Sequence, residues 1–226
     1  MLDRLLAQSP RFFTIYNAEF LLQALLTTFA LTALGCGVGL GLGLTLAVLR
    51  RTQGAALAPL RVLAILFVEL FRRIPFLVTL LLVFYGTQMA GLDASLFLIA
   101  TISVCLIATA YLSEIVRAGL DSVHARQWDS AAVANFTLLQ TLRIVVIPQA
   151  WKVILPPAFS FFLLFIKDSA LASQIGLVEL TYAGKMLNNR GFMPLLSFGT
   201  ILLLYFALSY PLTLLGRQLE ARLAEP

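Results

Sequence analysis

Long apolar runs alternate with short polar stretches along this chain, and the runs begin near Glu19, Leu60, Ser95, Trp151 and Pro194. Most of them reach about 20 residues, the length that an α-helix needs to cross the hydrocarbon core of a bilayer. A helix satisfies its backbone hydrogen bonds within one segment, as hydrocarbon surroundings require. The pattern therefore predicts an all-α integral membrane protein with about five transmembrane helices.

We expect these helices at about 19–49, 60–89, 95–117, 151–166 and 194–215. Residues 1–18 are then an extracytoplasmic, interfacial lead-in, residues 19–216 a transmembrane domain, and residues 217–226 a polar tail.

Composition agrees with a membrane protein, because 60% of the 226 residues are hydrophobic and only 12% are charged. Soluble domains average about 45–50% apolar and about 25% charged residues. The formal net charge of +5 does not indicate nucleic-acid binding, since the basic residues cluster at the ends of apolar runs. Their excess on one side predicts an extracytoplasmic N-terminus and a cytoplasmic C-terminus.

The residue types that usually hold metals are sparse. Cys36 and Cys105 both fall inside apolar runs, where a small core residue is the expected role. The single histidine, His124, has no cysteine or carboxylate at ligand spacing. We therefore expect no disulfide and no metal site.

Glycines crowd the second half of the first apolar run, in the stretch GCGVGLGLG. A nucleotide-binding glycine loop would need a preceding strand, which this run does not offer. Gly35, Gly39 and Gly43 instead repeat every four residues, a spacing that lets membrane helices approach closely.

Charge and a proline lie inside the second apolar run, in the segment Glu69-Leu-Phe-Arg72-Arg73-Ile-Pro75. Each arginine costs about 2.5–3.5 kcal/mol at the centre of a span. Pro75 removes one backbone hydrogen bond and should kink the helix. Charge within a span favours a functional site, although the arginines could also extend to a nearby interface.

The polar stretch from Arg117 to Pro157 cannot lie in hydrocarbon. We expect a short helix over 127–135 with Trp128 as an interfacial aromatic, and Asn135 in the left-handed region. Thr137 and Gln140 fit a capping box that opens a helix at Leu138, which Pro148 should interrupt. A short exposed helix held by a tight turn is suited to docking in a groove of a cytoplasmic partner.

These residues carry a family resemblance. QWDSAAVANF followed by IVVIPQA resembles the EAA loop of ABC-importer permeases, with Asp129-Ser130-Ala131 in place of the acidic-Ala-Ala triplet and Asn135 in place of a glycine. Three further segments resemble the family in the same order: ELFRRIPFLV, YLSEIVR and KDSALASQIG. Together they resemble the polar amino-acid branch, the histidine, glutamine and arginine type of type I importer.

The resemblance implies a permease subunit of an ATP-driven amino-acid importer in the bacterial inner membrane. It further implies two cytoplasmic ATPase subunits, a second permease that is identical or homologous, and an extracytoplasmic substrate-binding protein. The chain has no G-x-x-x-x-G-K-[ST] phosphate loop. ATP and Mg are therefore expected on the ATPase partners, with no cofactor and no enzymatic activity in this chain.

The resemblance implies two sets of candidate residues. One set couples the chain to the ATPase and lies in a cytoplasmic coupling loop at about 117–150, and the other binds the substrate near the translocation path. The ATPase-coupling set is Gln127, Trp128, Asp129, Ser130, Ala131, Asn135 and Phe136. For an amino-acid substrate, Arg72 suits the carboxylate and Asp168 the ammonium, with Thr79 and Ser173 as neutral partners.

Other readings stay open at this point. Asp168 could pair with Lys167 or an arginine and only hold the helices together. A secondary transporter or channel subunit for a small polar solute would also hold buried charges, but it would not need the helix–turn–helix loop. An intramembrane enzyme would need a nucleophile–base pair, and His124 lies in the polar loop.

Overall fold

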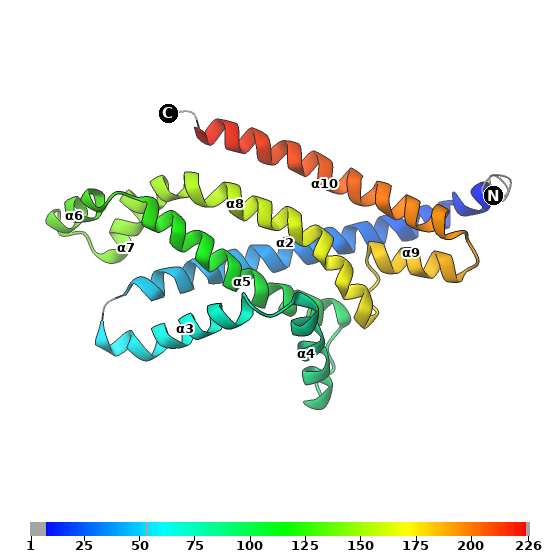
Figure 1. Cartoon of the computed structure of the whole chain (residues 1–226), viewed down its shortest axis with the longest axis horizontal. Coiled ribbons are helices and arrows are strands. Elements are labelled where there is room, and N and C mark those ends of the chain that lie inside the picture. Colours follow the sequence, from blue (N-terminus) through cyan, green and yellow to red (C-terminus); the bar gives the residue numbers. More distant parts are fainter. Residues whose placement is uncertain (1–7, 53, 225–226) are drawn as a thin grey trace. The chain divides into compact units, whose positions relative to one another are not determined.

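The computed structural model describes residues 8–52 and 54–224, and this part of the chain is helical with short connections (Figure 1). The longer helices are α2 (Ile15–Arg51), α3 (Ala58–Phe71), α4 (Phe76–Met89), α5 (Leu96–Ser122), α6 (Ala125–Val133), α8 (Ile147–Asp168), α9 (Leu180–Asn189) and α10 (Pro194–Ala224). The shorter ones are η1 (Ala55–Leu57), α7 (Leu138–Gln140), the π-helix η2 (Thr141–Val146) and the 3-10 helix η3 (Ser169–Ile175).

Among the described residues, four helical segments are long and apolar enough to cross a membrane: Ile15–Arg51, Leu96–Ser122, Leu138–Ile175 and Pro194–Leu223. The shorter apolar helix Phe76–Met89 brings the candidate spans to between four and five. This confirms the expected all-α membrane class.

The second expected helix is wrong, because the chain forms two helices of 14 residues in place of one kinked span. α3 ends at Phe71 and α4 begins at Phe76, with Pro75 as its N-cap residue. Proline disfavours helical backbone in the residue before it as well as removing its own N–H. Together these two effects end the helix rather than bend it.

Other expected boundaries also differ. α5 continues to Ser122, past the expected end at Arg117, and α10 continues to Ala224 through most of the polar tail. Pro148 does not interrupt the chain's helical course. It follows the π-helix η2 as the second residue of α8, and the first turn of an α-helix tolerates a missing N–H.

The chain divides into two compact units, each built from three segments. The first unit holds residues 1–35, 75–104 and 162–214, and the second holds residues 36–74, 105–161 and 215–226.

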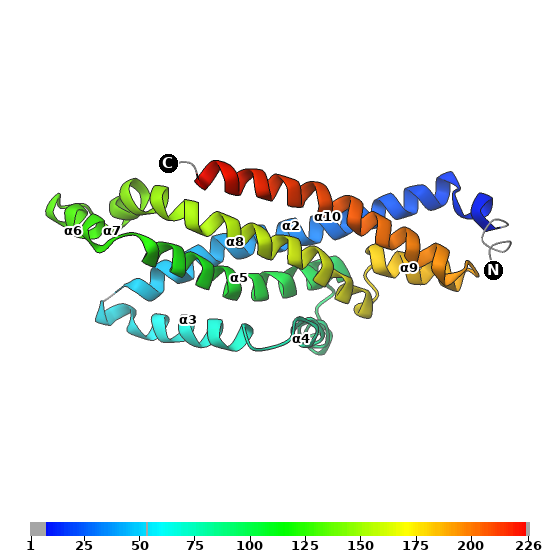
Figure 2. The same ribbon diagram turned by 45° about the horizontal axis from the view of Figure 1, so that its top comes forward.

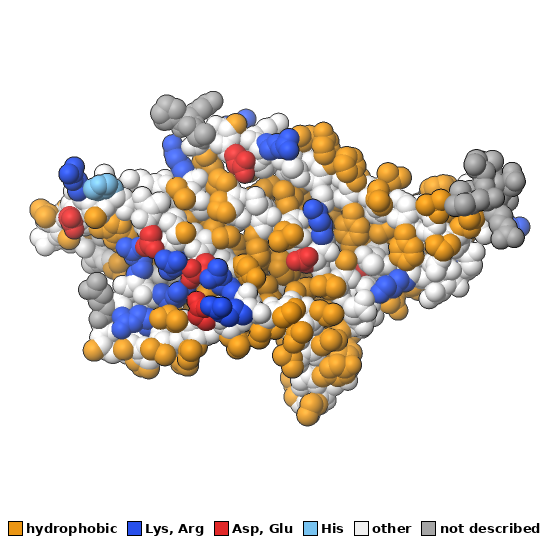
Figure 3. All heavy atoms as spheres, viewed as in Figure 1, with side chains coloured by type: hydrophobic (Ala, Val, Ile, Leu, Met, Phe, Trp, Pro, Cys, Tyr) orange, Lys and Arg blue, Asp and Glu red, His pale blue; other side chains and the backbone are white. Residues whose placement is uncertain are grey.

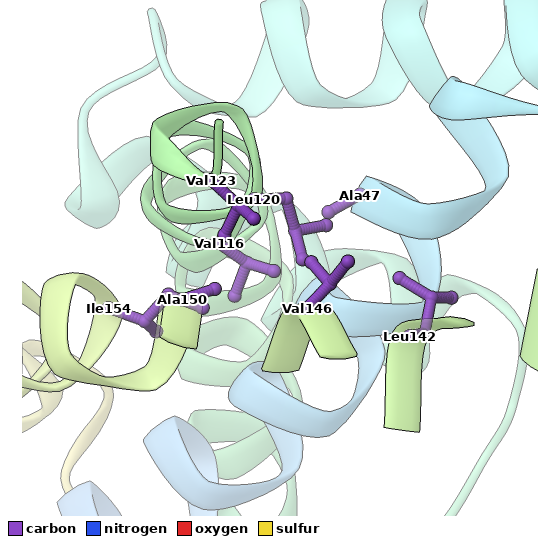
Figure 4. Close-up of a cluster of buried hydrophobic side chains, with 8 residues drawn as sticks. All are labelled: Ala47, Val116, Leu120, Val123, Leu142, Val146, Ala150 and Ile154. Atoms are coloured by element: carbon purple, nitrogen blue, oxygen red, sulfur yellow. The ribbon is translucent and has the colours of Figure 1, made fainter. Parts of the chain in front are cut away.

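The core of the second unit is a cluster of small and branched apolar side chains from α2, α5 and the residue after it, η2 and α8 (Figure 4). Its buried members are Ala47, Val116, Leu120, Val123, Leu142, Val146, Ala150 and Ile154. Gly39 and Gly43 of α2 lie directly against α5, since a Cβ on Gly39 would come within 2.5 Å of the Cβ of Ala108. At these two positions the predicted close packing is confirmed. Cys36 and Cys105 are free thiols; Cys36 is buried and Cys105 is partly buried.

The core of the first unit joins the start of α2 to α9 and α10, which lie side by side in Figures 1 and 2. Its buried members are Phe12, Leu21, Ala24, Leu180, Ala183, Leu187 and Ile201. The hydroxyl of Thr28 accepts a hydrogen bond from the backbone N–H of Leu180 at 3.2 Å. This bond ties the N-terminus of α9 to α2.

Candidate functional site

The polar loop of the second unit forms the predicted short helix, as α6. His124 begins it, because its Nδ1 accepts a hydrogen bond from the backbone N–H of Arg126 at 3.1 Å. This contact gives His124 a capping role. Within residues 8–52 and 54–224, there is no group of three or more His, Cys, Asp or Glu side chains placed to hold a metal ion.

The turn after α6 has the predicted backbone chemistry. Asn135 adopts a φ of 55°, and it is the only non-glycine residue with positive φ in the described chain. The N–H of Phe136 donates to the carbonyl of Ala131 at 3.0 Å, which closes the end of α6. Thr137 and Gln140 then form the predicted capping box at the start of α7. The helix–turn–helix expected from the sequence is therefore present.

The two faces of α6 have different surroundings. Trp128 is half-buried and packs on the apolar cluster of the second unit, and Ala131 is buried. The candidate residues Gln127, Asp129 and Ser130 are exposed instead. Arg126, Asp129, Ser130 and Val133 line an open hollow of about 400 Å³ on the exposed face. Val133, the last residue of α6, is 84% exposed and adds an apolar group to this polar surface.

α6 is also attached to its unit through Arg51, the last residue of α2. The Arg51 guanidinium lies 4.4 Å from the ring centroid of Trp128. It also forms an ion pair with Asp121 of α5. Arg51 therefore contacts α5 and α6 together.

Glu114 of α5 is the centre of a network of charged side chains in the second unit. Arg50 pairs with one of its carboxylate oxygens, and Arg117 pairs with the other at 2.9 Å. The guanidinium of Arg72 lies 3.7 Å from that second oxygen. Arg117 also pairs with Asp121 at 2.8 Å, so the network reaches the partner of Arg51. Figure 3 shows basic and acidic side chains gathered over α3 and α5.

Arg72 and Arg73 have different surroundings. The Arg72 guanidinium lies 5.8 Å from the Tyr111 ring centroid, while the Tyr111 hydroxyl donates to the carbonyl of Arg72 at 3.0 Å. The Arg73 side chain is 78% exposed and pairs with Glu69 at 2.7 Å. These residues line a hollow of about 230 Å³. Arg72 thus stands at the edge of an open space while one of its nitrogens faces Glu114.

Asp168, Thr79 and Ser173 belong to the first unit, whereas Arg72 belongs to the second. Asp168 is the half-buried last residue of α8. In the described part of the first unit, no ion pair joins it to Lys167 or to an arginine.

The two hydroxyl candidates are both buried. Thr79 is 2% exposed, and its hydroxyl has no hydrogen-bond partner among the described residues. The hydroxyl of Ser173, which is 4% exposed, instead accepts a hydrogen bond from the Lys185 ammonium of α9 at 3.0 Å.

Glu179 is a fully buried carboxylate that caps the N-terminus of α9 in the first unit. It accepts hydrogen bonds from the backbone N–H groups of Thr181 and Tyr182, at 2.9 and 2.7 Å, and from the hydroxyl of Tyr205 at 2.9 Å. Burial raises the pKa of this carboxyl above its usual value, although these hydrogen bonds act in the opposite direction.

Sequence reasoning missed Arg51, Glu114 and Lys185 as members of these networks. The spacing of Glu114, Arg117 and Asp121 places three charges on one face of a helix, which is a signal for ion pairing that can be read from sequence. The contacts of Arg51 and Lys185 come from separate elements and have no such local signal.

Known proteins are similar to this chain over most of its length. The chain is 33% identical over 160 residues to the probable glutamine ABC transporter permease protein GlnP of Bacillus subtilis (strain 168), covering 69% of this chain and 72% of that protein. It is 30% identical over 163 residues to the arginine ABC transporter permease protein ArtQ of Haemophilus influenzae, covering 69% and 74%.

Among solved structures, an amino acid ABC transporter with histidines superposes with a TM-score of 0.82 at 28% identity, covering 92% of this chain and 96% of that one. The protein family described as binding-protein-dependent transport system inner membrane component matches residues 39–225. This chain therefore belongs to that family, whose members are multi-pass inner-membrane permease subunits of ABC transporters that work with separate ATPase subunits.

Proposed function

We propose that this chain is the permease subunit of an ATP-driven importer of amino acids. The observation that carries the proposal is α6 with its Asn135 turn, which presents a polar face around the exposed Val133. A short helix of this kind fits a groove on an ATPase subunit. The relatives named for glutamine and arginine transport support an amino acid as the substrate.

The complete transporter contains two cytoplasmic ATPase subunits, a second permease and an extracytoplasmic substrate-binding protein. ATP hydrolysis in the ATPase subunits moves α6, and the attached helices follow as rigid bodies. A secondary transporter or a channel subunit would have no use for the exposed face of α6.

The orientation that we propose puts α6 and the C-terminus in the cytoplasm and the N-terminus outside. Its support is the positive-inside rule, since Arg50, Arg51, Arg117, Arg126 and Arg143 lie on the same side as α6 in this topology.

We propose that Arg72 contacts the substrate carboxylate, because it borders an open hollow and a guanidinium matches a carboxylate with two parallel hydrogen bonds. Its contact with Glu114 is long, at 3.7 Å, so it can exchange that partner for the substrate. We propose Asp168 for the substrate ammonium, because it is half-buried and no cation of its own unit pairs with it in the described chain.

The hydroxyls of Thr79 and Ser173 remain candidates for neutral contacts with the substrate. Ser173 already holds the Lys185 ammonium, so it would act together with that cation.

The ATPase partnership is tested by purifying tagged permease and counting the ATPase subunits that come with it. Asp129→Lys reverses a charge on the exposed face of α6 and should reduce their recovery. Asp93→Lys makes the same reversal at an exposed position in the turn before α5, and it should leave the recovery unchanged. Equal recovery in the two variants would contradict docking through α6.

The substrate residues are tested by ATP-driven uptake of labelled glutamine, arginine and histidine into proteoliposomes that contain the whole complex. Arg72→Ala and Asp168→Asn should each reduce uptake by about tenfold or more, the loss expected for one charge-assisted hydrogen bond. Thr87→Ala, which removes a hydroxyl bonded only to the carbonyl of Phe84, is the control. Normal uptake in both variants would refute the two assignments while leaving the transport function intact.

A further inference from the structure

Arg51 lies where three helices of the second unit meet. It is the last residue of α2, its guanidinium stacks 4.4 Å from the Trp128 ring centroid of α6, and it pairs with Asp121 of α5. Trp128 also packs on the apolar cluster of the same unit. The indole is therefore held between a hydrophobic core and a cation.

α6 depends on such contacts for its position. It has nine residues, and isolated helices shorter than about 12–15 residues are marginal in water. Of its nine side chains, only Trp128 and Ala131 are not exposed. A cation–π contact and an ion pair on a single guanidinium are thus a large part of what fixes this helix to its neighbours.

We propose that Arg51 is a positioning residue for energy coupling, which locks the coupling helix α6 to α2 and α5 so that the three move together. The inference rests on the proposed function, in which an ATPase subunit displaces α6. Without the lock, α6 could shift against its own unit, and part of the displacement would not reach the spans. A rigid-body movement of the three helices requires that the contacts between them stay intact while the ATPase subunit displaces α6.

Further ion pairs connect Asp121, the partner of Arg51, to other charged side chains of the same unit. Asp121 also pairs with Arg117, and Arg117 pairs with Glu114. The carboxylate of Glu114 faces Arg72 at the end of α3. An unbroken series of contacts therefore leads from the coupling helix to the residue that we assign to the substrate carboxylate.

The test is the number of substrate molecules taken up per ATP hydrolysed by the whole complex in proteoliposomes, with labelled glutamine, arginine and histidine as probes. Arg51→Gln should lower this ratio by about three- to thirtyfold, the range that a cation–π contact and a part-exposed ion pair give together. ATPase subunits should still be recovered with the variant, and the melting temperature of the complex should stay within a few degrees of the wild-type value.

Two further variants sharpen the result. Arg217→Gln removes the same charge from an exposed position of α10 in the same unit, where neither Trp128 nor Asp121 is its partner, and its ratio should equal the wild-type ratio. Trp128→Leu keeps an apolar side chain on the core but removes the aromatic face. It should lower the ratio too, and the double variant with Arg51→Gln should fall less than the product of the single effects.

An unchanged ratio in Arg51→Gln would overturn the inference. If that variant does not assemble, Trp128→Leu decides, and a wild-type ratio in Trp128→Leu overturns the inference equally. The wild-type complex distinguishes failure of the proposed function from failure of the Arg51 inference. No ATP-driven uptake there refutes the proposed function itself, whereas normal wild-type uptake with an unchanged variant ratio refutes only the role of Arg51.

Discussion

Gly43 of α2 lies so close to Ser113 of α5 that a Cβ on the glycine would come within 2.8 Å of the serine backbone nitrogen. The neighbouring atoms belong to backbone, which cannot move aside as a flexible side chain can. Gly41, two residues earlier, has open space around it, with no atom within 4 Å of a Cβ built there. The glycine-rich stretch of α2 thus has one packed face and one open face.

Gly43→Ala should lower the free energy of unfolding by about 1–3 kcal/mol, because overpacking forces the two helices apart. Gly41→Ala is the matched control, and it should leave stability unchanged or raise it by up to about 1 kcal/mol, since alanine favours a helix more than glycine does. Denaturant titration of the purified permease in detergent measures both. Equal destabilisation of the two variants would contradict the close contact of α2 with α5.

Asn135→Gly should preserve both recovery of the ATPase subunits and coupling, because glycine adopts the φ of 55° without strain. Asn135→Ala should lower stability by about 1–2 kcal/mol, since a Cβ is unfavourable in the left-handed region. Unfolding titrations and copurification of the ATPase subunits measure the two effects. Loss of coupling in Asn135→Gly would instead mean that the asparagine side chain contacts the partner.

Glu114→Gln should lower the free energy of unfolding by about 3 kcal/mol or more. The change removes the carboxylate that pairs with Arg50 and Arg117, and it leaves a part-buried positive charge without a partner. The control is Glu69→Gln, which breaks the exposed pair with Arg73 and should cost about 0–1 kcal/mol. Denaturant midpoints in detergent distinguish the two. A similar loss of stability in the two variants would show that water screens the charges around Glu114 as well as it screens the exposed pair of Glu69 and Arg73.

Stability should also depend on pH through Glu179, because burial raises the pKa of this carboxyl above the ordinary value of 4.5. The folded protein then binds the proton more tightly than the unfolded chain. The resulting stabilisation is fully present below about pH 4.5 and is lost as the pH rises through the folded pKa.

The variant Glu179→Gln cannot ionise and should remove this loss, so its melting temperature should fall less between pH 4.5 and neutral pH than that of the wild type. The variant should be less stable overall, because an amide replaces one of the oxygens that accept from Thr181, Tyr182 and Tyr205. Parallel pH profiles in the two proteins would show that Glu179 titrates as it does in the unfolded chain.

Local features of the coupling loop were predictable from the sequence. The left-handed Asn135 and the Thr137–Gln140 capping box depend on residues within a few positions of each other. The all-α class with four to five candidate spans was predictable as well, because bilayer thickness fixes the length of an apolar helix. The repeat of Gly39 and Gly43 indicated a packed helix face without identifying the partner helix.

The contacts within the candidate sites could not be predicted from the sequence. Arg50 and Glu114 are separated by 64 positions, and only the packing of α2 against α5 brings them together. The sequence also did not show which residues lie behind α6, so the packing of Trp128 on the apolar cluster came only from the structure.

The sequence by itself thus determined the membrane class, the family motifs and the backbone chemistry of the turn after α6, since each depends on apolar length or on neighbouring residues. The tertiary structure alone decided that the second expected span is two helices, that Pro148 is tolerated after a π-helix, and that Arg51 joins α6 to α5. The physical reason is that a proline can bend a helix, end it or be tolerated in its first turn, and that the contacts of Arg51 depend on which helices pack together. The choice of partner helix is a property of the whole fold, and no short stretch of the chain identifies it.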